Sequence, residues 1–406
     1  MRIAIVNVTY RSGSTGTIVK DLAEFAKNSG HEVLVFCGRG EEEPGVIKVQ
    51  TKSRLYIDAL KSRFLDNQGF NSKNATKRLI EQLRVFRPDV INLHNIHGYY
   101  LYLPMLFSYL KNEYQGKIVI TLHDSWLYTG HCSYYLSFHC QKWKTECDGC
   151  PGRKIYPKAY FAKAKQNFDR KMKLFQDLRN VTLVTPSEWL KKDVEQSPIL
   201  SRFPCITINN GIDTSLCRKC AASKTKGEKP IILGVANWWN PSKGLDVFGQ
   251  IQKSLGDSYR IDLCGGLKGK KPANLGDVEF KGLIKNQEEL FRMFGKASVF
   301  VNPTRMDNYP TVNLESICCG TPVVCFDVGG CKETIKDPRY GTCVKDVEQM
   351  IREIKRYSES SFEVDYSQYD KSTMCRAYLE LYESGRAQIV KETNLKEHNQ
   401  NRGDIS

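Results

Sequence analysis

Apolar runs alternate along the chain with segments of helical spacing. Residues 3–8, IAIVNV, are apolar at almost every position, which is typical of a strand covered on both faces in a parallel sheet. In residues 17–29 the apolar side chains recur every three or four positions, which predicts a helix. Residues 31–36, HEVLVF, give the next strand. This order of strand, helix and strand predicts an α/β fold built from parallel βαβ units.

The same alternation begins again in the second half, after a polar stretch at residues 219–229. A chain of 406 residues is longer than one hydrophobic core usually fills, so we expect two domains. We predict a first domain at 1–213 and a second at 214–370. A last helical segment follows at 371–390, and the polar tail 391–406 is expected to be disordered.

Residues 302–335 carry the strongest functional pattern. They begin where an apolar strand meets a proline, and open α/β sheets bind ligands at such carboxyl ends of strands. Pro310 and Thr311 then open a helix whose bare N–H groups suit an anion. Asp307 precedes this helix and Glu315 lies inside it, so the two carboxylates can face one crevice. The candidate ligand-binding residues of this stretch are Asp307, Asn308, Tyr309, Pro310, Thr311 and Glu315.

Gly329 and Gly330 close the stretch, and we expect their backbone amides to approach a ligand. Carboxylates for sugar hydroxyls, a helix N-terminus for phosphates and a paired-glycine turn together fit a nucleotide-diphosphate-sugar. The plainer alternative is a βαβ unit that happens to carry one surface acid and one acid in its helix.

The stretch resembles the E-x7-E signature of retaining glycosyltransferases of family 4, with Asp307 in place of the first Glu and Glu315 as the second. The form DNYPTVNLES, followed by CGTPVV and DVGG, resembles the capsule and exopolysaccharide branch, of the colanic-acid type. The resemblance implies the GT-B fold, in which two Rossmann-like, doubly wound parallel-sheet domains face a cleft. The first domain then binds the acceptor and the second binds the nucleotide-sugar.

The resemblance also implies catalytic residues. Members of this family aim the lysine of a KG pair at the donor diphosphate, and Lys243 matches it. They place a histidine near the sugar, and His123 matches that residue. We therefore expect His123, Lys243 and Asp307 to be catalytic. The family's arginine a few residues before the lysine is absent, since Val235 and Ala236 stand in its place, and Arg305 is a candidate substitute.

Two further features of the chain follow from the resemblance. Gly13 and Gly16 occupy the loop that faces the donor phosphates and the acceptor in this family. Tyr378 and Tyr382, in a helix predicted at 366–384, match an aromatic pair that family members use where the last helix crosses back onto the first domain.

Candidate acceptor contacts lie in the first half. Five of the seven histidines fall within residues 94–139. His97 and Asp124 follow two successive predicted strands, so both should point into the same crevice. Asp124 would orient an imidazole or cap the next segment. Ser72, in a polar loop, is a third candidate acceptor contact.

An insertion at residues 130–151 contains four cysteines with the spacing C-x7-C-x6-C-x2-C. Such a set can bind zinc tetrahedrally, and four thiolates would leave no open position for catalysis. The alternative is four unpaired thiols in a loop. The candidate ligands of this structural zinc are Cys132, Cys140, Cys147 and Cys150.

The net charge of +15 is concentrated in the first half. Residues 52–87 hold nine Lys or Arg against three acids, and residues 142–173 hold ten against three. No helix-turn-helix or RNA-binding signature accompanies them, so we do not expect a nucleic-acid partner. An anionic membrane surface fits at least as well. Residues 53–65 form a basic amphipathic pattern, which either lies in a membrane interface or packs on its own domain.

The sequence therefore predicts a retaining glycosyltransferase that needs no metal or other cofactor for catalysis. Its donor would be a UDP- or GDP-sugar, and its acceptor a glycan or a polyprenyl-diphosphate-linked oligosaccharide in cell-surface polysaccharide synthesis. We expect it in the cytoplasm, peripheral at the inner face of the cell membrane. The alternatives are an inactive GT-B scaffold, a nucleic-acid binder that uses the basic first half, and a GT-B epimerase or hydrolase.

Overall fold

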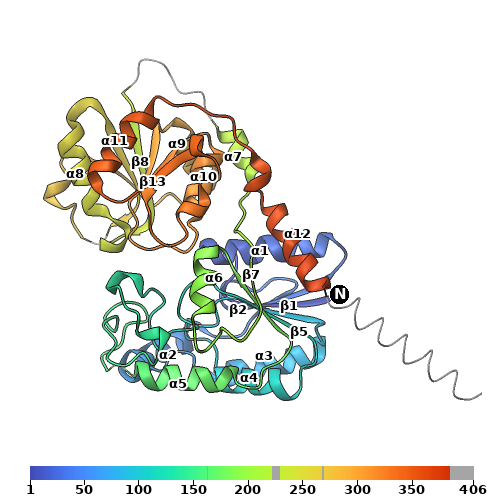
Figure 1. Cartoon of the computed structure of the whole chain (residues 1–406). Helices are drawn as coiled ribbons and strands as arrows, with labels where there is room; N and C mark the ends of the chain where they lie inside the picture. The colour runs from blue at the N-terminus through green and yellow to red at the C-terminus, as the bar shows by residue number, and fades with distance from the viewer. Residues whose placement is uncertain (162, 222–228, 268, 385–406) are drawn as a thin grey trace, which may run out of the picture.

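The computed structural model describes residues 1–161, 163–221, 229–267 and 269–384. It contains two domains, each built on a parallel sheet (Figure 1). The first sheet has seven strands in the order β3-β2-β1-β4-β5-β6-β7. Its strands are β1 (Arg2–Thr9), β2 (Glu32–Arg39), β3 (Val46–Lys48), β4 (Val90–Leu93), β5 (Lys117–Thr121), β6 (Val181–Thr185) and β7 (Cys205–Thr207).

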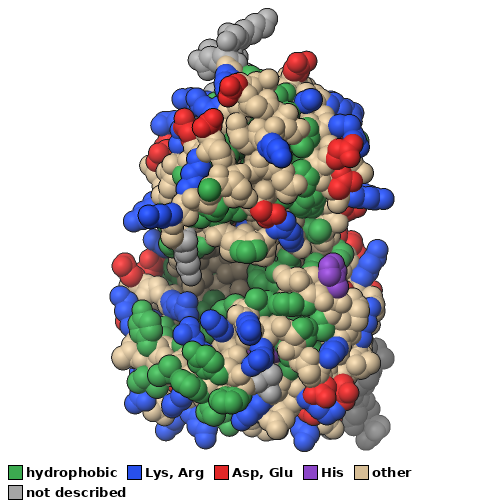
Figure 2. Space-filling view, turned by 90° about the vertical axis from the view of Figure 1, so that its left-hand side faces the viewer, with side chains coloured by type: hydrophobic (Ala, Val, Ile, Leu, Met, Phe, Trp, Pro, Cys, Tyr) green, Lys and Arg blue, Asp and Glu red, His purple; other side chains and the backbone are tan. Residues whose placement is uncertain are grey.

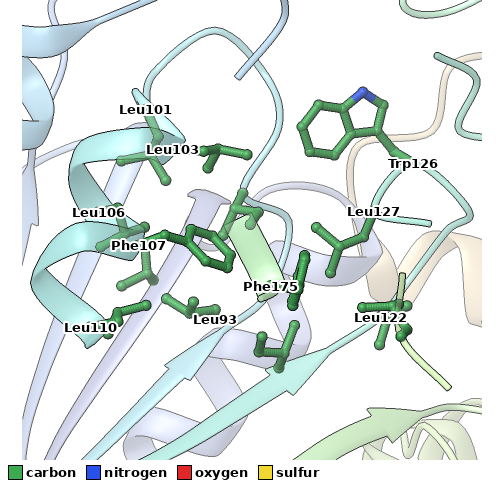
Figure 3. Packing of buried hydrophobic residues seen from close by; sticks show 14 of the residues in the cluster. Leu93, Leu101, Leu103, Leu106, Phe107, Leu110, Leu122, Trp126, Leu127 and Phe175 are labelled. Carbon is green, nitrogen blue, oxygen red and sulfur yellow. The ribbon is translucent and has the colours of Figure 1, made fainter. Parts of the chain in front are cut away.

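Helices cover both faces of the first sheet. On one face, Phe107 and Phe175 pack with their ring centroids 4.9 Å apart, within a cluster of leucines shown in Figure 3. On the other face, a second cluster joins the first helix to the last one of the chain. The helices of this domain are α1 (Gly13–Asn28), α2 (Lys52–Leu65), α3 (Lys73–Phe86), α4 (Leu103–Asn112), α5 (Ala164–Phe175) and α6 (Glu188–Glu195).

The second sheet has six strands in the order β10-β9-β8-β11-β12-β13, and every strand pairing recorded in either sheet is parallel. The two predicted doubly wound parallel-sheet domains are therefore confirmed. Its strands are β8 (Ile231–Trp239), β9 (Arg260–Leu267), β10 (Glu279–Gly282), β11 (Val299–Asn302), β12 (Val323–Phe326) and β13 (Gly341–Val344). Its helices are α7 (Thr214–Cys220), α8 (Leu245–Leu255), α9 (Gln287–Lys296), α10 (Thr311–Cys318) and α11 (Val347–Ser358).

Helix α12 (Lys371–Glu383) returns from the second domain and lies along α1 (Figure 1). The amide of Asn92, on β4, donates a hydrogen bond of 2.6 Å to the hydroxyl of Tyr382, and the hydroxyl of Tyr378 lies 3.4 Å from Thr121 Oγ1. These aromatic side chains fasten the last helix to the first sheet. The remaining residues of the predicted segments 371–390 and 391–406, from 385 on, lie outside the described residues.

Two predicted helix starts are wrong. The last helix does not begin at Tyr366, because Asp370 accepts a hydrogen bond of 2.8 Å from the amide of Ser372 and so caps α12. Helix α1 begins at Gly13, not at Thr17, and Thr17 Oγ1 donates to the Gly13 carbonyl. Gly13 and Gly16 therefore lie in the first turn of α1 and not in a loop before it.

Gly16 has a packing reason to be glycine. A Cβ atom at this position would lie 3.0 Å from Thr9 Oγ1 and 3.3 Å from the Arg11 nitrogen. The residue thus allows α1 to start close against the end of β1. Among the described residues, no helix is both long and apolar enough to cross a membrane.

Candidate active site

Lys243 and Asp307 come together at the carboxyl edge of the second sheet. Lys243 ends a short 3-10 turn after β8, and Asp307 lies in the loop between β11 and α10. Lys243 Nζ is 3.0 Å from Asp307 Oδ2, and the two side chains keep 36% and 25% of their surface exposed. The amide of Arg305 also donates to the Ser242 carbonyl at 2.8 Å, which ties the two loops together. The lysine and the acid of the predicted site therefore form an ion pair that solvent can reach.

Helix α10 offers its N-terminus beside this pair. Its N-cap residue is Pro310, and no side chain caps the helix. Asn313 fixes the helix from within, because it bonds to Asn302 on β11 at 2.8 Å and to Thr334 at 2.9 Å. Uncapped N–H groups on a rigidly held helix favour a bound phosphate.

Glu315 lies half-buried in the second turn of α10. Burial, with a smaller contribution from Cys217, raises its pKa to about 8. The structure records no direct contact between Glu315 and the Lys243–Asp307 pair among the described residues. Because its pKa is about 8, the Glu315 carboxyl group is largely protonated at neutral pH. It can then donate a hydrogen bond as well as accept one.

This raised pKa predicts a pH dependence of stability. A glutamate in an unfolded chain ionises near pH ~4.3, whereas the folded protein keeps the Glu315 proton up to about pH 8. Because the unfolded state loses its proton first, stability should fall as the pH rises between these two values. Glu315→Gln should remove this slope. It should also raise the melting temperature at alkaline pH, by roughly 2–4 °C for each kcal/mol of stability that the wild type loses there. Melting curves of both proteins across this pH range test it, and parallel slopes would contradict it.

Gly329 and Gly330 pack against the Asp307 loop. The amide of Gly330 donates to the Asp307 carbonyl at 3.1 Å. A Cβ atom on Gly329 would overlap the Asp307 carbonyl, and one on Gly330 would overlap the Asn308 carbonyl. The glycine pair thus lets two backbone segments approach closely, and it supports the loop that holds Asp307.

The first domain contributes His123, which follows β5. The Asn308 side chain of the second domain donates a hydrogen bond of 2.7 Å to the His123 carbonyl. His123 Nε2 lies 2.9 Å from His94 Nδ1, and the two rings stack. Burial lowers the pKa of His123 to about 4. Its imidazole is therefore neutral at physiological pH, and it lies at the junction of the domains beside the Asp307 loop.

His97 and Asp124 form a buried pair, with Nε2 and Oδ2 2.8 Å apart. Burial would raise the pKa of Asp124, but His97 and the amide of Trp126 together hold it below its ordinary value. Asp124 Oδ1 accepts from that amide at 2.9 Å. Asp124 thus orients the imidazole and caps the next segment at once, so both predicted alternatives hold. Ser72 lies apart from this pair, in a groove between α2 and α3.

Glu333, which the sequence did not single out, also joins the domains, and Tyr134 senses charges from both of them. Glu333, in the second domain, accepts hydrogen bonds of 2.7 Å from the amides of Glu188 and Trp189 at the start of α6. The charges of Asp124 and Asp307, one from each domain, both act with burial to raise the pKa of Tyr134. The sequence gives no sign of this contact, because Glu188 and Glu333 are 145 residues apart. Figure 2 shows the hollow between the two domains.

Arg305, the candidate substitute cation, is bound within the second domain. Its guanidinium forms two hydrogen bonds with the carboxylate of Asp246, at 2.9 and 2.7 Å, and a third with the Pro241 carbonyl. Two residues thus hold the Arg305 guanidinium, whereas Lys243 Nζ has one recorded partner, Asp307.

The four insertion cysteines lie near one another without forming a ready metal site. Cys132 shares a hydrogen bond with Cys150, and the charges of the other two thiols add to this contact and to burial in raising the pKa of Cys132. His131 is bound to Asp66 at 2.6 Å. No three His, Cys, Asp or Glu side chains are arranged around a metal position in the part of the chain that the structure describes. The zinc site at Cys132, Cys140, Cys147 and Cys150 stays a prediction, which elemental analysis tests.

Two protein-family models match this chain. Residues 15–216 match a model described as Glycosyltransferase Family 4. Residues 229–360 match one described as Glycosyl transferases group 1. The first match lies almost entirely in the first domain and the second lies within the second domain.

Individual proteins agree with these models. The chain is 25% identical over 355 residues to WcaC of Escherichia coli K12, whose name assigns it to colanic acid biosynthesis as a glycosyl transferase, covering 83% of this chain and 85% of that protein. It is 27% identical over 175 residues, 38% of this chain and 45% of that protein, to the N,N'-diacetylbacillosaminyl-diphospho-undecaprenol alpha-1,3-N-acetylgalactosaminyltransferase of Campylobacter jejuni. The crystal structure of Anabaena Alr3699/HepE in complex with UDP superposes with a TM-score of 0.59 at 15% identity, over 95% of this chain and all of that one (100%). The chain therefore belongs to the GT-B glycosyltransferases, with a first domain of the family 4 type and a second domain of the group 1 type.

Proposed function

We propose that this protein is a retaining glycosyltransferase of cell-surface polysaccharide synthesis. It moves a sugar from a nucleotide-diphosphate-sugar, with UDP or GDP as the nucleotide, to a hydroxyl group of its acceptor. The relatives support this choice, because one is named for colanic acid biosynthesis and a structural neighbour was solved with UDP.

The observation that carries the proposal is the solvent-accessible ion pair of Lys243 and Asp307 beside the uncapped start of α10. A lysine and a helix N-terminus together can hold a diphosphate without a metal ion. On binding, the donor diphosphate competes with Asp307 for Lys243, and Asp307 is then free to accept hydrogen bonds from the sugar. Lys243 stabilises the negative charge that develops on the leaving group.

The retaining course fits the groups available at the junction of the domains. His123 is neutral, so it can donate a hydrogen bond to the sugar without adding charge beside Lys243. In a retaining reaction of this kind the leaving phosphate takes the proton of the incoming hydroxyl, and no separate base is needed. An inverting reaction would need one, and His97 with Asp124 is the pair that could act.

The acceptor is a glycan or a polyprenyl-diphosphate-linked oligosaccharide, and the protein works in the cytoplasm at the inner face of the membrane. One relative is named for a diphospho-undecaprenol acceptor, which supports a lipid-linked substrate. The acceptor would approach from the side of the first domain, which holds His97 and Asp124.

A panel of UDP- and GDP-sugars, screened by thermal shift, tests the donor. We expect one sugar nucleotide to stabilise the protein. We assign the ribose of the donor to Glu315, so Glu315→Ala should lose this shift. Equal shifts in both proteins would contradict the ribose assignment, and no shift with any sugar nucleotide would contradict the function. Product formation without an added acceptor would instead favour an epimerase or a hydrolase.

A further inference from the structure

Helix α2 carries an exposed stripe of apolar side chains. Tyr56, Leu60 and Phe64 follow one another at four-residue steps and keep 78%, 56% and 49% of their surface exposed. The opposite side, which faces the domain, includes the buried residues Leu55, Asp58 and Ser62, two of which are polar. A surface helix of a globular domain normally buries its apolar stripe and exposes its polar one.

Polar bonds hold the inward side of α2 in place. Asp58 accepts hydrogen bonds from Ser72 and, at 3.4 Å, from Gln50. Asn71 donates to Ser62 Oγ at 3.2 Å. These bonds hold the inward side of the helix against the domain. The fold therefore keeps the apolar stripe exposed.

The apolar stripe continues onto a neighbouring loop. The ring of Tyr160 packs 5.2 Å from that of Phe64, and the Tyr160 amide donates to the Arg63 carbonyl at 2.7 Å. Tyr160 and Phe161 are 51% and 66% exposed. Figure 2 shows hydrophobic side chains gathered on this side of the first domain, with Lys and Arg around them. An exposed apolar patch of this kind marks an interaction surface.

Cations surround the patch. A groove of about 760 Å³ between α2 and α3 is lined by five basic side chains and two acids. One of these acids, Asp58, is turned inward onto Ser72, and the other, Glu81, lies 3.9 Å from Lys77. Among the described residues, no salt bridge is recorded for Arg54, Lys61 or Lys73. The five basic side chains of the groove are Arg54, Lys61, Lys73, Lys77 and Arg78.

We propose that this surface docks the protein on an anionic lipid bilayer. The α2 stripe enters the interfacial region, and the basic groove takes lipid phosphate groups. Charge complementarity selects this occupant, because a second copy of a chain with a net charge of +15 would be repelled. The inference rests on the proposed function, since a membrane-bound acceptor gives the docking its purpose.

Packed residues connect the groove to the buried pair of His97 and Asp124. Ser72 lines it and lies 3.0 Å from the Tyr99 carbonyl. The Tyr99 ring is 6.4 Å from that of Tyr156, whose hydroxyl is 3.1 Å from His97 Nδ1. Docking at the groove would therefore place the membrane on the side of the first domain that also holds His97 and Asp124.

Vesicle co-sedimentation of the full chain tests the proposal. The wild type should pellet with vesicles containing about one-third phosphatidylglycerol but not with pure phosphatidylcholine, and high salt should reduce binding. The triple variant Tyr56→Ser, Leu60→Ser and Phe64→Ser should lower the partition constant at least about tenfold. Val85→Ser, at a position 79% exposed on α3 outside the groove, is the matched control and should bind as the wild type does.

A second variant tests the contribution of the basic side chains to vesicle binding. Arg54→Gln with Lys61→Gln and Lys77→Gln should remove the preference for phosphatidylglycerol while leaving the apolar stripe intact. The proposal fails if the wild type does not bind these vesicles or if the triple variant binds them equally well. It also fails if the patch binds an acidic protein and not the vesicles.

Nucleotide-sugar thermal shifts separate this proposal from the proposed function, because α2 lies in the first domain, away from the Lys243–Asp307 pair. Vesicle binding without a nucleotide-sugar shift would keep the docking surface and reject the function. A shift without vesicle binding would do the reverse.

Discussion

Lys243→Ala is expected to lower kcat/KM for sugar transfer by about 10²- to 10³-fold, the loss typical when one group that stabilises developing charge is removed. Lys243 is the cation paired with Asp307 at the mouth of the site, at 3.0 Å. Without it, the leaving diphosphate keeps the helix dipole of α10 but has no full positive charge opposite it. Initial rates of nucleotide release with the donor identified by thermal shift would measure the loss.

Arg305→Ala is the matched control for this prediction. Arg305 carries the same charge on a neighbouring loop, but its guanidinium is bound to Asp246 and is 43% exposed. Its loss should change kcat/KM by less than about threefold, since exposed ion pairs contribute roughly 1 kcal/mol or less. If the Arg305 variant loses as much activity as the Lys243 variant, the assignment of the diphosphate to Lys243 is wrong.

Gly330→Ala should reduce activity by about 100-fold, because misplacing a catalytic group by an ångström can cost that much. The added Cβ atom would overlap the Asn308 carbonyl and lie 2.9 Å from Ser187 Cβ in the first domain. The segment that holds Asp307 and the contact of Asn308 with His123 must then shift. Steady-state kinetics and the melting temperature would be measured together.

Gly320→Ala separates steric displacement from loss of backbone freedom. Gly320 has φ of 79°, but a Cβ atom there meets nothing within 4 Å. The substitution should cost about 1 kcal/mol of stability through left-handed strain and leave turnover nearly unchanged. Equal loss of turnover in both variants would show that Gly330 acts through general stability and not through the Asp307 loop.

Much of the fold was predictable because its signals are local. The apolar runs of β1 and β11 specify doubly buried strands, and Pro310 and Thr311 mark the start of α10 from the sequence alone. The start of α1 was missed because Gly13 and Gly16 are typical of loops. Only contact with the end of β1 shows why glycines open this helix.

The site was predictable only in part. The motif of Asp307 and the lysine of the KG pair identified the residues that meet at the second sheet. The engagement of Arg305 by Asp246 and the packing of Gly330 on the Asp307 loop could not be seen, since each depends on residues distant in sequence. The bonds of Glu333 to the start of α6 belong to the same class.

The sequence by itself determined two parallel α/β domains and the family of the chain, because periodicity and motif spacing are properties of neighbouring residues. The tertiary structure alone decided which way α2 faces: its pattern fits a helix packed on its domain or one lying in a membrane. Hydrogen bonds from Gln50, Asn71 and Ser72 hold the polar side inward. Those partners flank the helix in the chain, but only folding brings them against one side of it, and so leaves the other side for a partner.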